Sequence, residues 1–161
     1  MKNMQKIQKI LTNPDFKAYV KANKAAEKKR KYCKHNLAHF LDVARIGYIT
    51  ILETGFKIDK EILYAAALLH DIGRFRQYED GTPHEWASAQ LCRPILRDAG
   101  FSEAEVNAIA EAILVHRDSA TKKRKDLCGV LFNADKLSRN CTSCKMNEKC
   151  DWEHKNAEFT T

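Results

Sequence analysis

The sequence predicts an all-α protein, a single-domain bundle of about six to eight helices. Apolar residues recur at intervals of three and four along most of the 161-residue chain, which is the spacing of one helix face. Several of these stretches begin at residues that are typical of helix N-caps. Alternating patterns of the strand type are almost absent, and the length is sufficient for one domain with a sizeable core.

The first helical patterns lie in a strongly basic segment. An apolar stripe over residues 4–11 ends at the sequence NPD, and a second stripe begins at Phe16. Residues 1–34 contain eleven Lys and Arg against two acidic residues, so the net charge of +7 arises here and the rest of the chain is nearly neutral. We interpret the segment first as a solvated helix face. Attraction of a phosphorylated ligand or of a nucleic acid is the alternative.

A longer helix and a central helix are predicted next. Apolar residues continue with helical spacing from Leu37 until Gly55, which ends the pattern. Asp59 can cap the following helix, KEILYAAALLHD, which is apolar on nearly every side. We therefore expect that helix at the centre of the bundle. Gly73 and the sequence YEDGTP then indicate a loop.

Two capping patterns open the next helices. The sequence TPHE supplies an N-cap at Thr82 and a first helical residue at Pro83, and this helix is expected to end at Gly100. The sequence SEAE, which begins at Ser102, is a capping box for a helix that runs to about His116. A basic loop, TKKRK, follows this helix.

Asp126 can start the last predicted helix, LCGVLFNADKLSR, and no repeat, flexible linker or second domain is visible. The longest apolar run, ILYAAALL, is too short to span a bilayer. The N-terminal sequence MKNMQKIQKI lacks the apolar stretch of a signal peptide. We therefore expect a cytoplasmic protein without a membrane partner. The oligomeric state is left open, with a homo-oligomer as one option.

The most unusual feature is the pair His70 and Asp71 at the end of the most apolar helix. Burial of an isolated ionised carboxylate costs much free energy, so another group must compensate for it. A cation is the simplest compensation. The alternative is that Asp71 pairs with Arg74 or caps the next turn.

Other residues of the metal-ligand type also fall near helix ends or on inner helix faces. Together with the His70 and Asp71 pair, these residues make six candidate metal ligands: His39, His70, Asp71, His84, His116 and Asp135. Mixed imidazole and carboxylate sites suit divalent ions such as Zn, Mn, Fe, Ni or Mg, with open positions for water. A single buried histidine is more often a satisfied core residue, but this number of candidates in a small domain favours a metal site.

Three stretches resemble the HD superfamily of metal-dependent phosphohydrolases: HFLDVARI, AALLHDIGR and LFNADKLS. The resemblance covers roughly residues 33–140 and implies the all-α HD-type fold. It implies that one metal ion is held by His39, His70, Asp71 and Asp135. The remaining parts are then residues 1–32, a basic N-terminal helical segment packed on the domain, and residues 141–161, a cysteine-containing tail.

The sequences PHEWAS and ILVHR, which contain His84 and His116, resemble the subset of this superfamily with two extra histidines. Members of that subset, which includes phosphodiesterases and diadenosine tetraphosphate hydrolases, can hold a second metal with the aspartate of the HD pair as a bridge. The resemblance thus implies one or two divalent ions and water-driven cleavage of a phosphoester or phosphoanhydride bond. The expected substrate is a nucleotide or a similar small phosphorylated compound.

Several residues near the predicted ligands are candidates for catalysis. Asp71 is the expected bridge between metals, and Arg74, Arg117 and Lys136 are candidates for phosphate contact, with surface solvation as the alternative. His35 lies one turn before His39 but at no matching position of the superfamily, so its role stays open among substrate contact, support of a ligand and no function.

Two other functions remain open for this protein. One is that of a di-iron oxygenase, because some HD proteins with extra histidines have that activity. A non-enzymatic, nucleic-acid-binding or regulatory protein is suggested by the basic segment and by the cysteine tail.

The tail carries three closely spaced cysteines, Cys141, Cys144 and Cys150. Disulfides are unusual in the cytoplasm, so such a cluster suggests metal ligands. Thiolate sites usually have four ligands. Cys33 is the preferred fourth ligand, and His154 is an outside candidate.

The choice of Cys33 rests on position along two helices. Cys33 precedes His39 by six residues, and Cys141 follows Asp135 by six. If the helices that carry His39 and Asp135 run antiparallel around one metal, Cys33 and Cys141 are both displaced from that metal in the same direction along the helix axes. The displacement is about 9 Å, at roughly 1.5 Å per residue. A structural zinc ion or a four-iron, four-sulfur cluster fits such ligands. Reduced thiols without a metal are the alternative.

Overall fold

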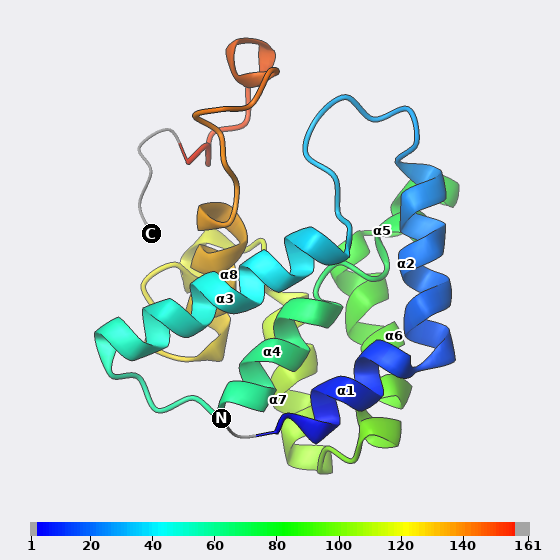
Figure 1. The fold of residues 1–161 in the computed structure, drawn as a ribbon, viewed down its shortest axis with the longest axis vertical. Coiled ribbons are helices and arrows are strands. Elements are labelled where there is room, and N and C mark those ends of the chain that lie inside the picture. The colour runs from blue at the N-terminus through cyan, green and yellow to red at the C-terminus, as the bar shows by residue number, and fades with distance from the viewer. Residues whose placement is uncertain (1–2, 157–161) are drawn as a thin grey trace.

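The protein is a bundle of helices, and its prediction as an all-α protein is confirmed (Figure 1). The computed structural model describes residues 3–156, and over that range it contains no strand. The first two residues of the predicted N-terminal segment and the last five of the predicted tail lie outside this range. The α-helices are α1 Gln5–Thr12, α2 Pro14–Ala26, α3 Leu37–Thr54, α4 Lys60–Leu69, α5 Arg74–Glu79, α6 His84–Ala99, α7 Glu103–Leu114 and α8 Leu127–Leu137. Two short 3-10 helices are η1 Ser119–Thr121 and η2 Asn147–Lys149.

Helix α4 lies at the centre of the bundle, as its sequence predicts. It packs against α1, α3, α7 and α8, and its last five residues, 65–69, are fully buried. The side chain of Asp59 accepts the N–H groups of Glu61 and Ile62, which caps the start of the helix. The apolar character of this helix on all sides is therefore explained by neighbours on all sides.

Helices α3 and α8 pack closely together and against α4. A Cβ atom at Gly47 would lie 3.1 Å from Leu63 and 3.4 Å from Ala134, so glycine permits the close approach of the three helices. Asn36 caps the start of α3, and Gly55 ends it in the left-handed conformation, with φ of 73°. This packing brings the start of α3 next to the end of α8.

Helices α1 and α2 cover one side of the bundle. Helix α1 packs on α4 and α6, and α2 packs on α5. Ile7, Ile10 and Phe16 are buried against the core, whereas most of the basic residues of this segment are exposed. None of the helices in the described range has both the length and the apolar character that a bilayer crossing requires.

Two local predictions need correction. Thr82 is not an N-cap, because Pro83 has an extended backbone, with ψ of 126°, and occupies the cap position itself, so that α6 begins at His84. Helix α5 lies partly in the segment assigned to a loop, and its six residues are too few to show a periodic pattern. The capping box of Ser102 and Glu105 is present as predicted.

Candidate metal centre

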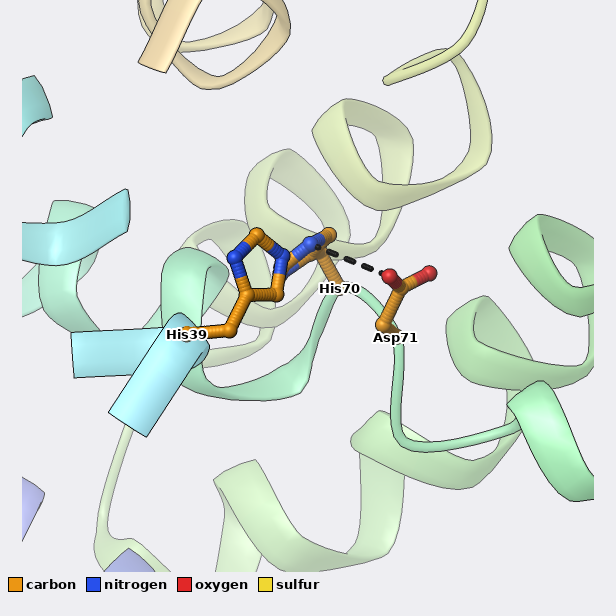
Figure 2. A group of neighbouring side chains, drawn as sticks. All are labelled: His39, His70 and Asp71. Carbon is orange, nitrogen blue, oxygen red and sulfur yellow. Dashed lines mark ion pairs between the residues drawn. The ribbon is translucent and has the colours of Figure 1, made fainter. Parts of the chain in front are cut away.

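His70 occupies the C-terminal end of α4, and its ring is oriented by the helix itself. Nδ1 of His70 donates to the carbonyl oxygen of Ala67 at 2.7 Å, one of the carbonyl groups that a helix end leaves without a partner. Nε2 is therefore the ring nitrogen available to a metal. It lies 3.4 Å from Oδ2 of Asp71 (Figure 2). It also lies 3.6 Å from Oδ1 of Asp135.

His116 and His84 face the other oxygen of Asp71. His116 follows the end of α7, and its Nδ1 donates to the carbonyl oxygen of Ile113 at 2.6 Å, so its Nε2 faces Oδ1 of Asp71 at 3.6 Å. His84 is the first residue of α6. Its Nδ1 lies 2.6 Å from Oε1 of Gln77, and its Nε2 lies 3.1 Å from the same Oδ1 of Asp71. One oxygen of Asp71 thus faces His70, and the other faces His84 and His116.

His39 and Asp135 form the side of the cluster made by α3 and α8. The N–H of His39 donates to the cap residue Asn36, which places His39 in the first turn of α3. Nε2 of His39 lies 3.3 Å from Oδ1 of Asp135. Burial, together with the adjacent Arg139 guanidinium, lowers the pKa of His39 to about 4, so its ring is neutral near pH 7.

The six residues predicted as metal ligands therefore meet in one buried cluster. Their ligand atoms form three groups within which all atoms lie within 4.8 Å of one another. The groups are His39 with His70 and Asp71, His70 with His116 and Asp135, and Asp71 with His84 and His116. The three groups share His70, Asp71 and His116, so the cluster is continuous.

The polar atoms of this cluster fit divalent cations. Nε2 of His70, Oδ1 of Asp71 and Oδ1 of Asp135 are buried without a hydrogen-bond partner, which is costly for polar groups. Burial alone raises the pKa of each carboxyl group, but the surrounding histidines outweigh this effect and hold both pKa values well below their usual range. Carboxylate oxygens and imidazole nitrogens are the donor set of divalent transition metals. The cluster could therefore bind a divalent metal.

The cluster opens into a cavity of about 660 Å³. Five basic residues line it: Arg30, Arg74, Arg117, Lys136 and Arg139. Nη1 of Arg74 lies 2.9 Å from Nε2 of His84 and 3.8 Å from Oδ1 of Asp71, so this guanidinium group is directly beside the predicted bridge. A cavity with carboxylates and imidazoles at its base and guanidinium groups on its walls suits an anionic ligand held by cations.

The two other predicted phosphate contacts are placed differently. Nζ of Lys136 donates to Oδ2 of Asp135 at 2.9 Å and to the carbonyl oxygen of His116 at 3.0 Å, so it links two parts of the cluster. Arg117 lies at the rim, where its side chain is 57% exposed and its Nη1 is 3.6 Å from Oε2 of Glu85. Lys136 therefore supports the ligands, whereas Arg117 is free to reach solvent or a ligand.

Arg139 lies in the site although it is not among the residues predicted from the sequence. Its Nη2 lies 3.0 Å from Nε2 of His39 and 3.7 Å from Oδ1 of Asp135, and its side chain is 10% exposed. The only available signal was its position one helical turn after Asp135. A lone arginine at a helix end is usually a surface residue, so this signal was too weak.

Asn23, on α2, was also missed, although it holds the turn that carries Asp71. This fully buried side chain donates from Nδ2 to the carbonyl oxygen of Asp71 at 2.9 Å and accepts the N–H of Phe75 at 2.8 Å. On the other side of the turn, the N–H of Gly73 donates to Oγ of Ser88 at 2.9 Å. A Cβ atom at Gly73 would lie 2.6 Å from the backbone nitrogen of Ser88, so glycine is required there.

His35 lies inside the site, although its sequence position matches no superfamily ligand. It is 5% exposed, and its Nδ1 lies 2.5 Å from Oε1 of the buried Glu27. Its Nε2 lies 3.7 Å from Oδ2 of Asp71. Glu27 is surrounded in sequence by lysines and an arginine, so nothing in its local pattern indicates that it is buried.

Replacing Asn23 with alanine is expected to destabilise the protein by roughly 2–4 kcal/mol, because the carbonyl of Asp71 and the N–H of Phe75 both lose a buried partner. Urea unfolding measures the change in the free energy of unfolding. Asn107→Ala is the matched control, since Asn107 is exposed and the only hydrogen bond of its side chain in the described part of the chain is one that it accepts from Arg93. Equal stability of the two variants would contradict the role of Asn23 in holding the turn that carries Asp71.

The cysteines of the predicted second site are only partly brought together. Cys33 and Cys150 line the same cavity, and the hydroxyl of Tyr32 donates to the carbonyl oxygen of Lys149 at 3.4 Å. Cys141 is buried. Within residues 3–156, however, no group of three ligand atoms that includes a sulfur lies within 4.8 Å. The cysteine metal site therefore stays a prediction.

That prediction is tested by changing Cys141 and Cys144 together to serine. If the cysteines bind a metal, the variant is expected to lose one equivalent of zinc, or the iron of one cluster, while the ions of the histidine cluster remain. Elemental analysis of protein purified without oxygen gives the count. Cys92→Ser is the control, because Cys92 is fully buried in the apolar core and burial raises the pKa of its thiol to about 12. An unchanged metal content in the double variant would show that the thiols are unligated.

Comparison with known proteins adds three findings. The family model described as HD domain matches residues 36–140. An uncharacterized protein from Clostridium beijerinckii is 45% identical over 156 residues, which are 97% of this chain and 98% of that protein. A protein named Ribonuclease Y from a Sulfurovum species is 37% identical over 62 residues, which are 38% of this chain and 12% of that protein. No solved structure matches the chain significantly.

Proposed function

Because the chain belongs to the HD domain family, we propose that it is a cytoplasmic metal-dependent phosphohydrolase. Its proposed substrate is a nucleotide or a similar small phosphorylated compound with a phosphoester or phosphoanhydride bond. The observation that carries this proposal is the position of Asp71. Its two oxygens face different histidines at the base of a cavity whose walls carry arginines.

The proposed ligands fall into two overlapping sets. His39, His70, Asp71 and Asp135 would hold one ion, and Asp71, His84 and His116 would hold a second. Bound divalent ions supply positive charge for the phosphoryl oxygens and increase the acidity of a coordinated water molecule. Asp71 belongs to both sets, so it keeps the two positions close together.

The basic residues would orient the substrate and preserve the ligand geometry. Arg74 lies beside Asp71 and Arg139 beside Asp135, and both line the cavity. A guanidinium group can bind a phosphate through two parallel hydrogen bonds. Lys136 keeps Asp135 in place through its hydrogen bond. The cavity volume of about 660 Å³ lies within the usual range for small-molecule sites, which supports a small substrate.

Assays of the metal-loaded, full-length protein test the proposal. Release of phosphate or nucleotide is measured for nucleoside mono-, di- and triphosphates, dinucleoside polyphosphates and a short RNA, which is included because of the local similarity to a protein named Ribonuclease Y. Turnover of at least one small compound is expected. Absence of hydrolysis of every substrate by protein that holds its ions would contradict the proposal. Oxygen consumption by the same preparation would instead favour the di-iron oxygenase.

A further inference from the structure

Glu27 and His35 form a further carboxylate and histidine pair beside the candidate metal centre, and both residues lie outside the matched HD domain. The match begins at residue 36, so both residues precede it. Both are nonetheless buried, with 2% and 5% of their surface exposed. The proposed mechanism leaves both without a role.

Glu27 orients the imidazole ring of His35 by two contacts. Oε2 of Glu27 accepts the backbone N–H of His35 at 2.8 Å, and Oε1 lies 2.5 Å from Nδ1. A carboxylate at this position requires a proton on Nδ1, so Nε2 is the nitrogen left for another partner. Histidines that bind metals usually donate their other N–H to a carboxylate or carbonyl in this way.

The partner that Nε2 of His35 faces is Oδ2 of Asp71, at 3.7 Å. This distance is too long for a direct hydrogen bond. It suits two ligands of one ion, because atoms at about 2.1 Å from a metal and separated by about 110–120° lie roughly 3.4–3.6 Å apart. The other histidine and carboxylate pairs of the cluster are separated by comparable distances, from 3.1 Å for His84 and Asp71 to 3.6 Å for His70 and Asp135.

We propose that His35 is a further metal ligand and that it holds an ion together with Asp71. In the described range, no third side chain completes a ligand group with His35, and both residues line the cavity. The other coordination positions of this ion are therefore open to water and to phosphate oxygens, as is usual for ions that bind with a phosphorylated ligand. This inference rests on the proposed metal centre, but it does not require that the protein hydrolyses a particular substrate.

Counting bound Mn²⁺ tests the inference without any measurement of turnover. The metal-free, full-length protein is titrated with Mn²⁺ in the presence of inorganic phosphate, and free Mn²⁺ is followed by electron paramagnetic resonance. His35→Ala is expected to bind one ion fewer than the wild type, or to bind that ion at least about tenfold more weakly. Glu27→Gln keeps a hydrogen-bond acceptor but loses the charge, and about a 10–100-fold weaker affinity is expected at the same site.

Tyr32→Phe is the matched control, since Tyr32 lines the same cavity and, within the described range, its hydroxyl donates to the carbonyl oxygen of Lys149 and contacts no proposed ligand. Wild-type numbers and affinities of Mn²⁺ in His35→Ala would overturn the inference. Unchanged Mn²⁺ binding with weaker phosphate binding would also overturn it, since His35 would then contact the anion directly. If His35→Ala does not fold, wild-type binding by Glu27→Gln decides against the inference. A wild-type protein that binds the ions but hydrolyses nothing would refute only the proposed function.

Discussion

Replacing His70 and Asp71 together with alanine is expected to remove the divalent ions of the cluster and to lower kcat/KM for the best substrate by at least about a thousandfold. Both residues belong to the central ligand groups, and Asp71 contributes to two of them. A metal ion provides several kcal/mol of transition-state stabilisation, and each 1.36 kcal/mol corresponds to about a tenfold change in rate. Elemental analysis and steady-state kinetics on the same preparation measure both effects.

Asp42→Ala is a suitable control for this variant. Asp42 lies on α3 near His39, but its side chain is 52% exposed, and Arg45 is its only ion-pair partner within residues 3–156. Wild-type metal content and kinetics are therefore expected. If the His70 and Asp71 double variant retained its hydrolysis, the metal-dependent mechanism at this cluster would be wrong, whatever the metal content.

Removal of the metals with a chelator is expected to lower the midpoint of thermal unfolding by roughly 10 °C. Without cations, one buried oxygen atom of Asp71 and one of Asp135, Oδ1 in each case, have no hydrogen-bond partner among the described residues. Loss of one partner of a buried ion pair costs about 3–5 kcal/mol, and for a protein of this size about 1 kcal/mol shifts the midpoint by 2–4 °C. Differential scanning calorimetry before and after chelation measures the shift, and addition of Mn²⁺ should reverse it.

The same chelation experiment on the variant that lacks His70 and Asp71 shows whether the stabilising metal is bound at the histidine cluster or at another site. Its midpoint should change little on chelation, because the cluster no longer binds the ions. A large drop in this variant would assign the stabilising metal to another site, and the cysteine tail would be the first candidate. No change in the wild-type protein would contradict the stabilising role of the metal in the cluster.

Most of the helices were predictable because their signals are local. The apolar stretch of α4 and the caps of α4 and α7 depend on residues within a few positions of each other. The errors have local causes too. Pro83 adopts an extended backbone that displaces the cap from Thr82, and α5 has only six residues. Short helices gain little from their own periodicity and depend on packing for their stability.

The candidate ligands were predictable for a related reason. His70, Asp71 and Asp135 stand out because they interrupt apolar helices, and a buried charge needs a partner. By contrast, Arg139 lies beyond such a stretch, where an arginine on a solvated surface looks the same. A polar residue in an apolar stretch indicates a buried polar site from the sequence alone, whereas a charged residue outside such a stretch gives no sign of whether it is buried.

The sequence by itself determined the helical class, the central position of α4 and the set of metal-ligand candidates. Only the tertiary structure decided that α2 takes part in the site. Asn23 and Asp71 are 48 positions apart, yet they form a buried hydrogen bond, and Glu27 becomes buried only where α2 and the following loop meet the end of α4. Backbone preferences and apolar spacing act over a few residues, whereas a contact of this kind depends on how complete helices pack.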